Sequence, residues 1–179
     1  MSEIFLRARA GEAEAFRVIF DTHAPAVRRF LGDVLRDDGQ ADEATQETFV
    51  RAHARLGSLS DGSRLQAWLF GIARMVFLEQ LRRPRARGLD EAPVEVDRAP
   101  TPEAALLTRE ADAVLDRALA DLADERRAAL LLRLDHGLGY GEIALAMGWP
   151  LQKVKNEIHR ARLQLRERLA GYLAGEPCT

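Results

Sequence analysis

The sequence predicts an all-α protein: two small helical domains joined by a flexible Pro-rich acidic linker, the second domain containing a helix-turn-helix. Three observations lead to this prediction. Apolar residues recur at three- and four-residue spacing on both sides of residues 84–103. Residues 84–103 themselves hold four of the seven prolines and almost no periodic apolar pattern. Neither flank shows the alternating apolar pattern or the hairpin dipeptides that predict strands.

The first domain, residues 1–83, carries three helical patterns in a row. The break GSLSDGS at 57–63 separates the second pattern from the third and has the composition of a loop. We expect Trp68 to be a core residue rather than a platform for base stacking, because it shares the spacing of its apolar neighbours. The apolar positions are Phe16, Ile19, Phe20, Val27, Phe30, Leu31 and Val34, then Ala41, Ala44, Phe49, Ala52 and Leu56, then Leu65, Trp68, Leu69, Ile72, Val76, Phe77 and Leu81.

The segment 84–103, PRARGLDEAPVEVDRAPTPE, predicts a flexible linker. Each proline lacks a backbone donor and disfavours helix in the residue before it. The alternative is an ordered surface loop of a single domain, but a loop of about this length without secondary structure is uncommon inside a compact fold. The predicted boundaries are therefore 1–83, 84–103 and 104–179.

The second domain predicts helices near 104–122, 125–136, 141–147 and 151–170. Between the last two stands Gly148-Trp149-Pro150. Glycine can take the left-handed conformation that ends a helix, and proline is tolerated where a helix begins. Two helices joined so abruptly predict a helix-turn-helix.

The spacing of residues in the last helix predicts one apolar and one polar face. At about 100° per residue, the apolar face holds Leu151, Val154, Ile158, Ala161 and Leu165. The other side carries amides suited to base edges and cations suited to phosphates. A helical hairpin with a merely solvated charged face is the alternative; the tight turn and six cations in this segment favour DNA binding. The candidate DNA-binding residues here are Gln152, Lys153, Lys155, Asn156, His159, Arg160 and Arg162.

Charge is unevenly distributed along the chain. The formal net charge is only −2, but 64–88 holds six arginines against one glutamate, and 150–170 has a net charge of +4. Acids dominate 31–49, with a net charge of −5, and 89–103, with −4. The chain therefore has two basic segments, an acidic connector and an acidic segment near its start, and this distribution is more informative about nucleic-acid binding than the net charge.

Several classes of protein have no support. The one cysteine, Cys178, allows no intrachain disulfide, which fits a reducing cytoplasm. No apolar run reaches the roughly 18 residues of a membrane span. Metal-ligand spacings such as HExxH or CxxC are absent, as are glycine-rich phosphate loops, so we expect no metal, no cofactor and no enzymatic activity.

At this point the chain resembles a known family, the extracytoplasmic-function (ECF) sigma factors of bacterial RNA polymerase. Residues 114–169 resemble that family's promoter-binding C-terminal domain, with the helix-turn-helix YGEIALAMGWPLQKVKNEIHRAR at 140–162. Residues 40–56 are similar to its helix that binds core polymerase: QADEATQETFVRAHARL. Residues 65–83 are similar to its helix for the downstream promoter element: LQAWLFGIARMVFLEQLRR. The three motifs stand in the family's order and cover nearly all of the chain except the linker and the ends.

The resemblance implies a contact between the acidic helix and a basic coiled coil of core RNA polymerase. The residues implied are Asp42, Glu43, Gln46, Glu47 and Phe49. Complementary charge would steer this encounter. Asp42 and Glu43 have an alternative explanation, because acids near the start of a helix are stabilised by its macrodipole. Phe49 also fits the core.

The resemblance further implies that residues 57–83 bind the melted promoter strand. Arg74, Arg82 and Arg83 would contact phosphates, and Ser60 and Asp61 lie in the loop where the family reads a flipped base. Two positions differ from the family's pattern. Met75 stands where asparagine is usual after Ala-Arg, and Gly71 stands mid-helix where a larger residue is usual.

We therefore predict an alternative sigma factor that binds core polymerase and promoter DNA, both double-stranded and melted, and is regulated by an anti-sigma factor packing between its domains. One alternative is a sigma-like mimic that binds an anti-sigma factor without promoter recognition. Another is a dimeric helix-turn-helix repressor, which would leave the first domain unexplained. In the last helix, Glu157 either accepts from a cytosine amino group or pairs locally with Lys153.

Overall fold

The computed structural model describes residues 2–82 and 113–173, and its regular secondary structure over these residues is entirely helical. The first domain contains α1 (Ser2–Arg9), α2 (Ala13–Leu35), α3 (Asp38–Arg55) and α4 (Leu65–Arg82). Two short 3₁₀ turns, Leu56–Ser58 and Gly62–Arg64, connect α3 to α4 across the predicted loop. The predicted linker, 84–103, lies outside the described residues.

Local signals in the sequence set the boundary between α2 and α3. Arg36 ends α2 in the left-handed conformation with φ 59°, and its N–H donates to the carbonyl of Gly32. Asp37 then caps α3, because its carboxylate accepts from the backbone N–H of Gln40 at 2.9 Å. Such a cap satisfies one of the donors that a helix start leaves unpaired. The two helices are thus joined in a tight antiparallel pair.

The second domain contains a helical segment over 113–120, then α6 (Asp124–Leu134), α7 (Tyr140–Met147) and α8 (Leu151–Leu173). Gly148 ends α7 with φ 63°, as the sequence predicted, and the N–H of Trp149 returns to the carbonyl of Ala144 at 3.0 Å. At the other end of α7, the carboxylate of Glu142 accepts from the N–H of Gly139 at 2.7 Å. The predicted helix-turn-helix of α7 and α8 is confirmed.

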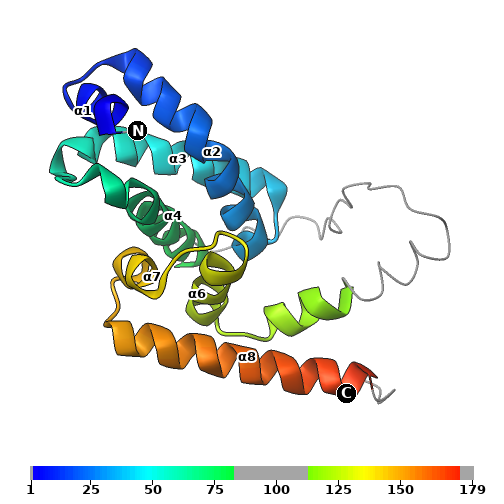
Figure 1. Cartoon of the computed structure of the whole chain (residues 1–179). Coiled ribbons are helices and arrows are strands. Elements are labelled where there is room, and N and C mark those ends of the chain that lie inside the picture. The colour runs from blue at the N-terminus through cyan, green and yellow to red at the C-terminus, as the bar shows by residue number, and fades with distance from the viewer. Residues whose placement is uncertain (1, 83–112, 174–179) are drawn as a thin grey trace, which may run out of the picture.

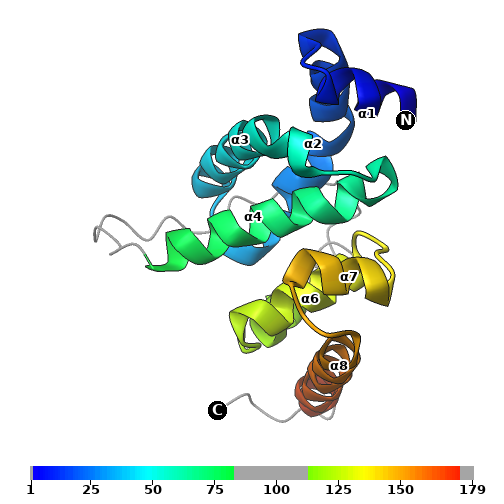
Figure 2. The ribbon, with the colours of Figure 1, turned by 90° about the vertical axis from the view of Figure 1, so that its left-hand side faces the viewer.

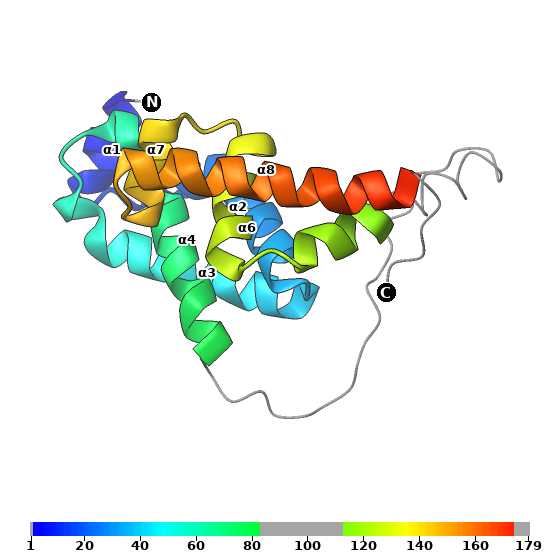
Figure 3. The same cartoon turned by 90° about the horizontal axis from the view of Figure 1, so that it is seen from below.

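The helices stack in three tiers. In Figures 1 and 2, α6 and α7 lie between the first domain and α8, with α7 running against α4. Figure 3, from below, shows α8 crossing the outer side of α6 and α7. The buried apolar residues form one continuous core that runs from α1 through to α8. The all-α fold is confirmed, and the two domains share this core because α4 packs on α7 and α2 packs on α6.

Candidate functional site

The predicted outer face of α8 is exposed over residues 151–162. Val154, Ile158 and Ala161 are buried against α6 and α7, and this fixes the rotation of the helix. Leu151 was expected on the same apolar face but is exposed, because it begins the helix at the edge of the domain. The residues exposed on the other side include all those predicted to contact DNA: Gln152, Lys153, Lys155, Asn156, His159, Arg160 and Arg162.

Two contacts organise the polar side chains at the start of α8. The amide of Gln152 donates to Oδ1 of Asn156 at 3.0 Å, so the two amides form a pair on one helix turn. The ammonium of Lys153 lies 4.1 Å from the centre of the Trp149 ring, a cation–π contact. Asn156 keeps its amide donors, and Gln152 keeps its carbonyl acceptor. A donor and an acceptor side by side are what the major-groove edge of adenine requires.

Glu157 does not pair with Lys153, so the local pairing expected from the sequence is wrong. Its carboxylate instead accepts from Arg126 of α6 at 2.8 Å and from Arg160 at 3.0 Å, and its side chain is only 15% exposed. The hydrogen bond from Arg126 holds the pKa of Glu157 below its usual range. Glu157 therefore fastens α8 to α6 and leaves the outer face to the cations and amides.

The carboxylate of Asp61 stabilises the conformation of the loop before α4. Asp61 accepts from the hydroxyl of Ser63 at 2.7 Å and from its backbone N–H at 2.9 Å, and these bonds hold the pKa of Asp61 below its usual range. Ser60 is exposed beside it. The loop thus presents an ionised acceptor and a hydroxyl on a fixed backbone.

The three arginines predicted to contact phosphates along α4 have different surroundings. Arg82 is exposed at the end of the helix, and Arg83 lies outside the described residues. Arg74 forms an ion pair with Glu125 of α6, and its side chain is 16% exposed. In this arrangement the guanidinium of Arg74 is engaged by a carboxylate of the second domain. Trp68 is half-buried against the core, as predicted.

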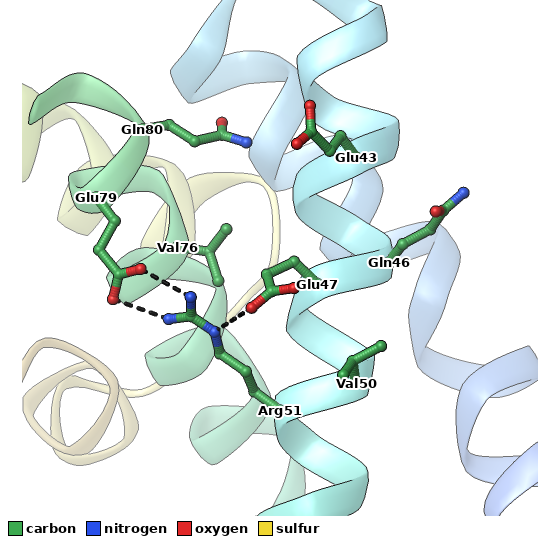
Figure 4. A pocket seen from close by; sticks show the side chains of 8 residues that line it. All are labelled: Glu43, Gln46, Glu47, Val50, Arg51, Val76, Glu79 and Gln80. Carbon is green, nitrogen blue, oxygen red and sulfur yellow. Dashed lines mark hydrogen bonds and ion pairs between the residues drawn. The ribbon is translucent and has the colours of Figure 1, made fainter. Parts of the chain in front are cut away.

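A shallow cavity of about 210 Å³ lies between α3 and α4 (Figure 4). From α3 it is lined by Glu43, Gln46 and Glu47, the polar residues expected to meet the polymerase, together with Val50, which is 64% exposed. Figure 4 shows Glu43 and Glu47 on the side of α3 that faces α4, whereas Gln46 points away from α4. The other lining residues are Arg51, Val76, Glu79 and Gln80.

Sequence reasoning missed Arg51, which organises this cavity. Its guanidinium donates twice to the Glu79 carboxylate of α4, at 2.7 and 2.8 Å, and once to Glu47 at 2.6 Å (Figure 4). The hydrogen bonds from Arg51 to Glu79 raise the pKa of Arg51 further above its usual range. The four-residue spacing of Glu47 and Arg51 could have indicated their pair, but nothing local indicated Glu79.

Two other residues of the predicted polymerase contact are also engaged inside the chain. Asp42 accepts from Arg28 of α2. Phe49 is 4% exposed and its ring packs edge-on against Phe20 at 4.8 Å. Phe49 therefore lies in the core, as its alternative explanation expected, and its contact with the polymerase stays a prediction. Burial follows because its position on α3 faces α2.

Within residues 2–82 and 113–173, no cluster of histidine, cysteine or carboxylate side chains could hold a metal ion. Over the same residues no helix is both long enough and apolar enough to cross a membrane.

Comparison with protein families finds two matches that follow the two domains. The model described as "Sigma-70 region 2" matches residues 19–87, and the model described as "Sigma-70, region 4" matches residues 112–165. The first match contains α3, the loop and α4. The second contains the helix-turn-helix and the polar face of α8.

Two curated relatives that align with most of this chain are ECF RNA polymerase sigma factors. The ECF RNA polymerase sigma factor SigL of Mycobacterium tuberculosis is 33% identical over 165 residues, which is 89% of this chain and 91% of SigL. The ECF RNA polymerase sigma factor SigE of Mycolicibacterium smegmatis is 34% identical over 152 residues, 83% of this chain but 59% of SigE.

Two solved structures share the arrangement of helices. The sigma factor RpoE of Bartonella quintana, in complex with the anti-sigma factor NepR, is 28% identical with a TM-score of 0.70, covering 88% of this chain and 98% of RpoE. CnrH, in complex with the cytosolic domain of CnrY, has a TM-score of 0.70 over 94% of this chain and 96% of CnrH. At 23% identity, CnrH supports the fold alone.

Proposed function

This chain belongs to the ECF sigma factors of RNA polymerase, and from that premise we propose which of its surfaces carries each step of promoter-specific initiation. The family is a class of transcription regulators, and no catalytic step is assigned to this chain. It acts in the cytoplasm, where it finds the core polymerase. The observation that carries the proposal is the exposed face of α8, whose amides and cations are held outward by the buried contacts of Val154 and Ile158.

The first surface is the acidic side of α3, which meets a basic segment of core RNA polymerase. Glu43, Gln46 and Glu47 line the cavity beside α4, and exposed Val50 supplies an apolar contact within it. Charge complementarity sets the rate of encounter, and the apolar contact adds affinity once the surfaces meet.

The second surface is the loop before α4 together with α4 itself, which binds the melted strand of the downstream element. Ser60 offers a hydroxyl and Asp61 a carboxylate acceptor to an extruded base. Arg74 and Arg82 neutralise phosphates along the strand. The capped conformation of Asp61 reduces the ordering that this loop requires on binding.

The third surface is the outer face of α8, which enters the major groove of the upstream element. The Gln152–Asn156 pair reads a base edge, and Lys155, Arg160 and Arg162 contact phosphates on either side. Phosphate contacts fix the register of the helix, so the amides need to discriminate only one or two base pairs.

The test is run-off transcription with purified core polymerase on a library of candidate promoters. We expect initiation at a small subset of promoters, dependent on this protein and abolished by omitting it. A protein that binds core polymerase or an anti-sigma factor yet directs no initiation on any member of the library would instead be a sigma-like mimic.

We also propose an anti-sigma factor as the regulator of this chain. The similar RpoE was solved with an anti-sigma factor, and this chain covers 98% of that protein with a TM-score of 0.70. Co-purification of such a partner with the tagged chain, and loss of run-off transcription on adding it, is the expected result.

A further inference from the structure

The N-terminal helix α1 lies against the loop that is proposed to read an extruded base. It packs on both 3₁₀ turns of this loop, Leu56–Ser58 and Gly62–Arg64, as well as on α2. Figure 1 shows α1 beside the turn between α3 and α4. Phe5, on the inner side of α1, is only 3% exposed. The first helix of the chain thus supports a loop that is far from it in the sequence.

The contact between Phe5 and Gly62 leaves no room for a side chain at position 62. A Cβ atom on Gly62 would lie 2.7 Å from Cδ1 of Phe5 and 2.9 Å from Cγ, distances that real Cβ atoms essentially never show. Because Cγ lies on the axis about which the ring turns, rotating the ring in place cannot relieve the second contact. The ring therefore packs directly on the backbone of Gly62, next to Asp61.

Contacts between α1 and α2 hold the ring of Phe5 in place. The Nε of Arg7 donates to the Glu12 carboxylate at 2.9 Å, and the N–H of Glu12 donates to the carbonyl of Arg7 at 3.1 Å. Gly11 makes the turn between them with φ 96°, a conformation that glycine adopts without strain. Ala8 is buried on the same face of α1 as Phe5. These contacts set the angle between α1 and α2, and with it the position of the ring.

The hydrogen bonds that shape the loop itself are local. The N–H of Leu59 donates to the carbonyl of Leu56 at 3.1 Å, and the N–H of Arg64 donates to the carbonyl of Asp61 at 3.1 Å. These bonds define each turn but do not fix where the two turns lie on the domain. That position depends on apolar packing, through the ring of Phe5 and the buried side chain of Leu59.

We propose that Phe5 is a positioning residue for base selection: its ring, packed on Gly62, holds Ser60 and Asp61 where they meet the extruded base. The proposal rests on the proposed function of this loop as the reader of that base. Ser60 and Asp61 are both exposed, so burial of their own side chains does not hold them. A backbone shift of about 1 Å at Gly62 would misplace both hydrogen-bonding groups. Phe5 is buried, so it acts through the loop and not by touching the base.

The test measures run-off transcription by the full chain with core polymerase, on promoters that differ at single bases of the downstream element. In Gly62→Ala the added methyl group forces the ring and the loop apart, so we expect the preference for the best base over the next to fall about tenfold. Base preference at the upstream element and affinity for core polymerase should not change. A merely structural defect would instead lower transcription from all promoters alike.

Gly32→Ala is the matched control. Gly32 lies in α2, where a Cβ atom would meet nothing within 4 Å, so the same change should leave base preference unchanged. Phe5→Ala removes the ring instead and should also lower the preference about tenfold. Because both single changes break one contact, the double variant should lose about tenfold and not the roughly hundredfold expected of independent sites. Circular dichroism checks that each variant is folded, and Phe5→Ala decides if Gly62→Ala is not.

The possible failures are distinguishable. A wild-type protein without base preference in the downstream element overturns the proposed reading of a base by this loop, and the positioning role with it. A wild-type preference that both single variants retain overturns the positioning role alone. Losses that multiply in the double variant, or that extend equally to the upstream element, would mean that Phe5 serves only the core.

Discussion

The outer face of α8 and the face of α4 both carry cations predicted to meet DNA, yet only one of them is open. On α8, Lys155 and Arg162 are exposed and point away from the domain core. On α4, Arg74 is paired with Glu125 and covered by the second domain. An arginine is thus exposed on α8, at Arg162, but held in an ion pair on α4, at Arg74. Tertiary packing, and not the helix itself, decides which DNA contact is available first.

The largest effect on the open face is expected from Val154→Asp. Val154 is fully buried between α8 and α7, so the substitution leaves an unpaired charge in the core and costs about 3–5 kcal/mol of unfolding free energy. Binding to the upstream element should be lost together with helical signal in circular dichroism. Leu163→Asp, at an exposed apolar position of α8, is the control and should retain both. Retained binding by Val154→Asp would mean that α7 does not brace α8.

The next largest effect concerns the outer face of α8, where Asn156 and Arg162 are predicted to make different kinds of DNA contact. Asn156→Ala removes one amide of the Gln152 pair and should cost roughly 1–3 kcal/mol on the preferred element, with relaxed choice at one base pair. Arg162→Ala should weaken all sequences alike and lower the salt slope by about one unit. Affinity across single-base variants at two salt concentrations separates the two. Identical uniform losses would contradict direct reading by Asn156.

The third prediction concerns α3, which is predicted to contact the polymerase, whereas α4 and α8 are predicted to contact DNA. Reversing Asp42, Glu43 and Glu47 to lysine should lower affinity for core polymerase about tenfold at low salt and less at high salt, because the association is steered by charge. Asp42 also pairs with Arg28, so Asp42→Lys combined with Arg28→Glu is the matched control. If that swap restores full affinity, Asp42 serves only the pairing of α2 with α3.

The smallest effect concerns the covered face and pH. His136 has a pKa held below its ordinary value of 6.5 by burial first and by Arg29 second, with Asp135 acting in the opposite direction. A lowered histidine pKa means that the packing of His136 against Phe30 and Phe70 prefers the neutral ring. Its stabilisation is therefore complete above about pH 6.5 and is lost as pH falls through the lower folded-state pKa.

We expect the radius of gyration from X-ray scattering to increase between pH 7.5 and pH 5.5. His136→Phe keeps an aromatic ring between Phe30 and Phe70 without a titrating group, so it should remove most of this dependence. An equal increase in wild type and variant would mean that other groups cause the two domains to separate at low pH.

Much of this molecule is determined by local sequence. A period of 3.6 residues is enough to rotate α8 so that Val154 and Ile158 face inward and Asn156 faces outward, because each position depends only on its distance along one helix. Gly148 could be recognised as the end of α7 for the same reason, since the left-handed conformation is a property of a single residue.

Only the tertiary structure decided the long-range pairs. Arg74 meets Glu125, and Glu157 meets Arg126 rather than nearby Lys153, because partners 51 and 31 residues away are brought close by the packing of α6. Gly71 differs from the family's pattern for no reason visible along the chain. Its reason is the backbone of α7 at 3.3 Å from where a Cβ would stand, a distance set by how two helices cross. Periodicity fixes which face of a helix is buried, whereas the identity of what covers it depends on packing between segments that the sequence leaves far apart.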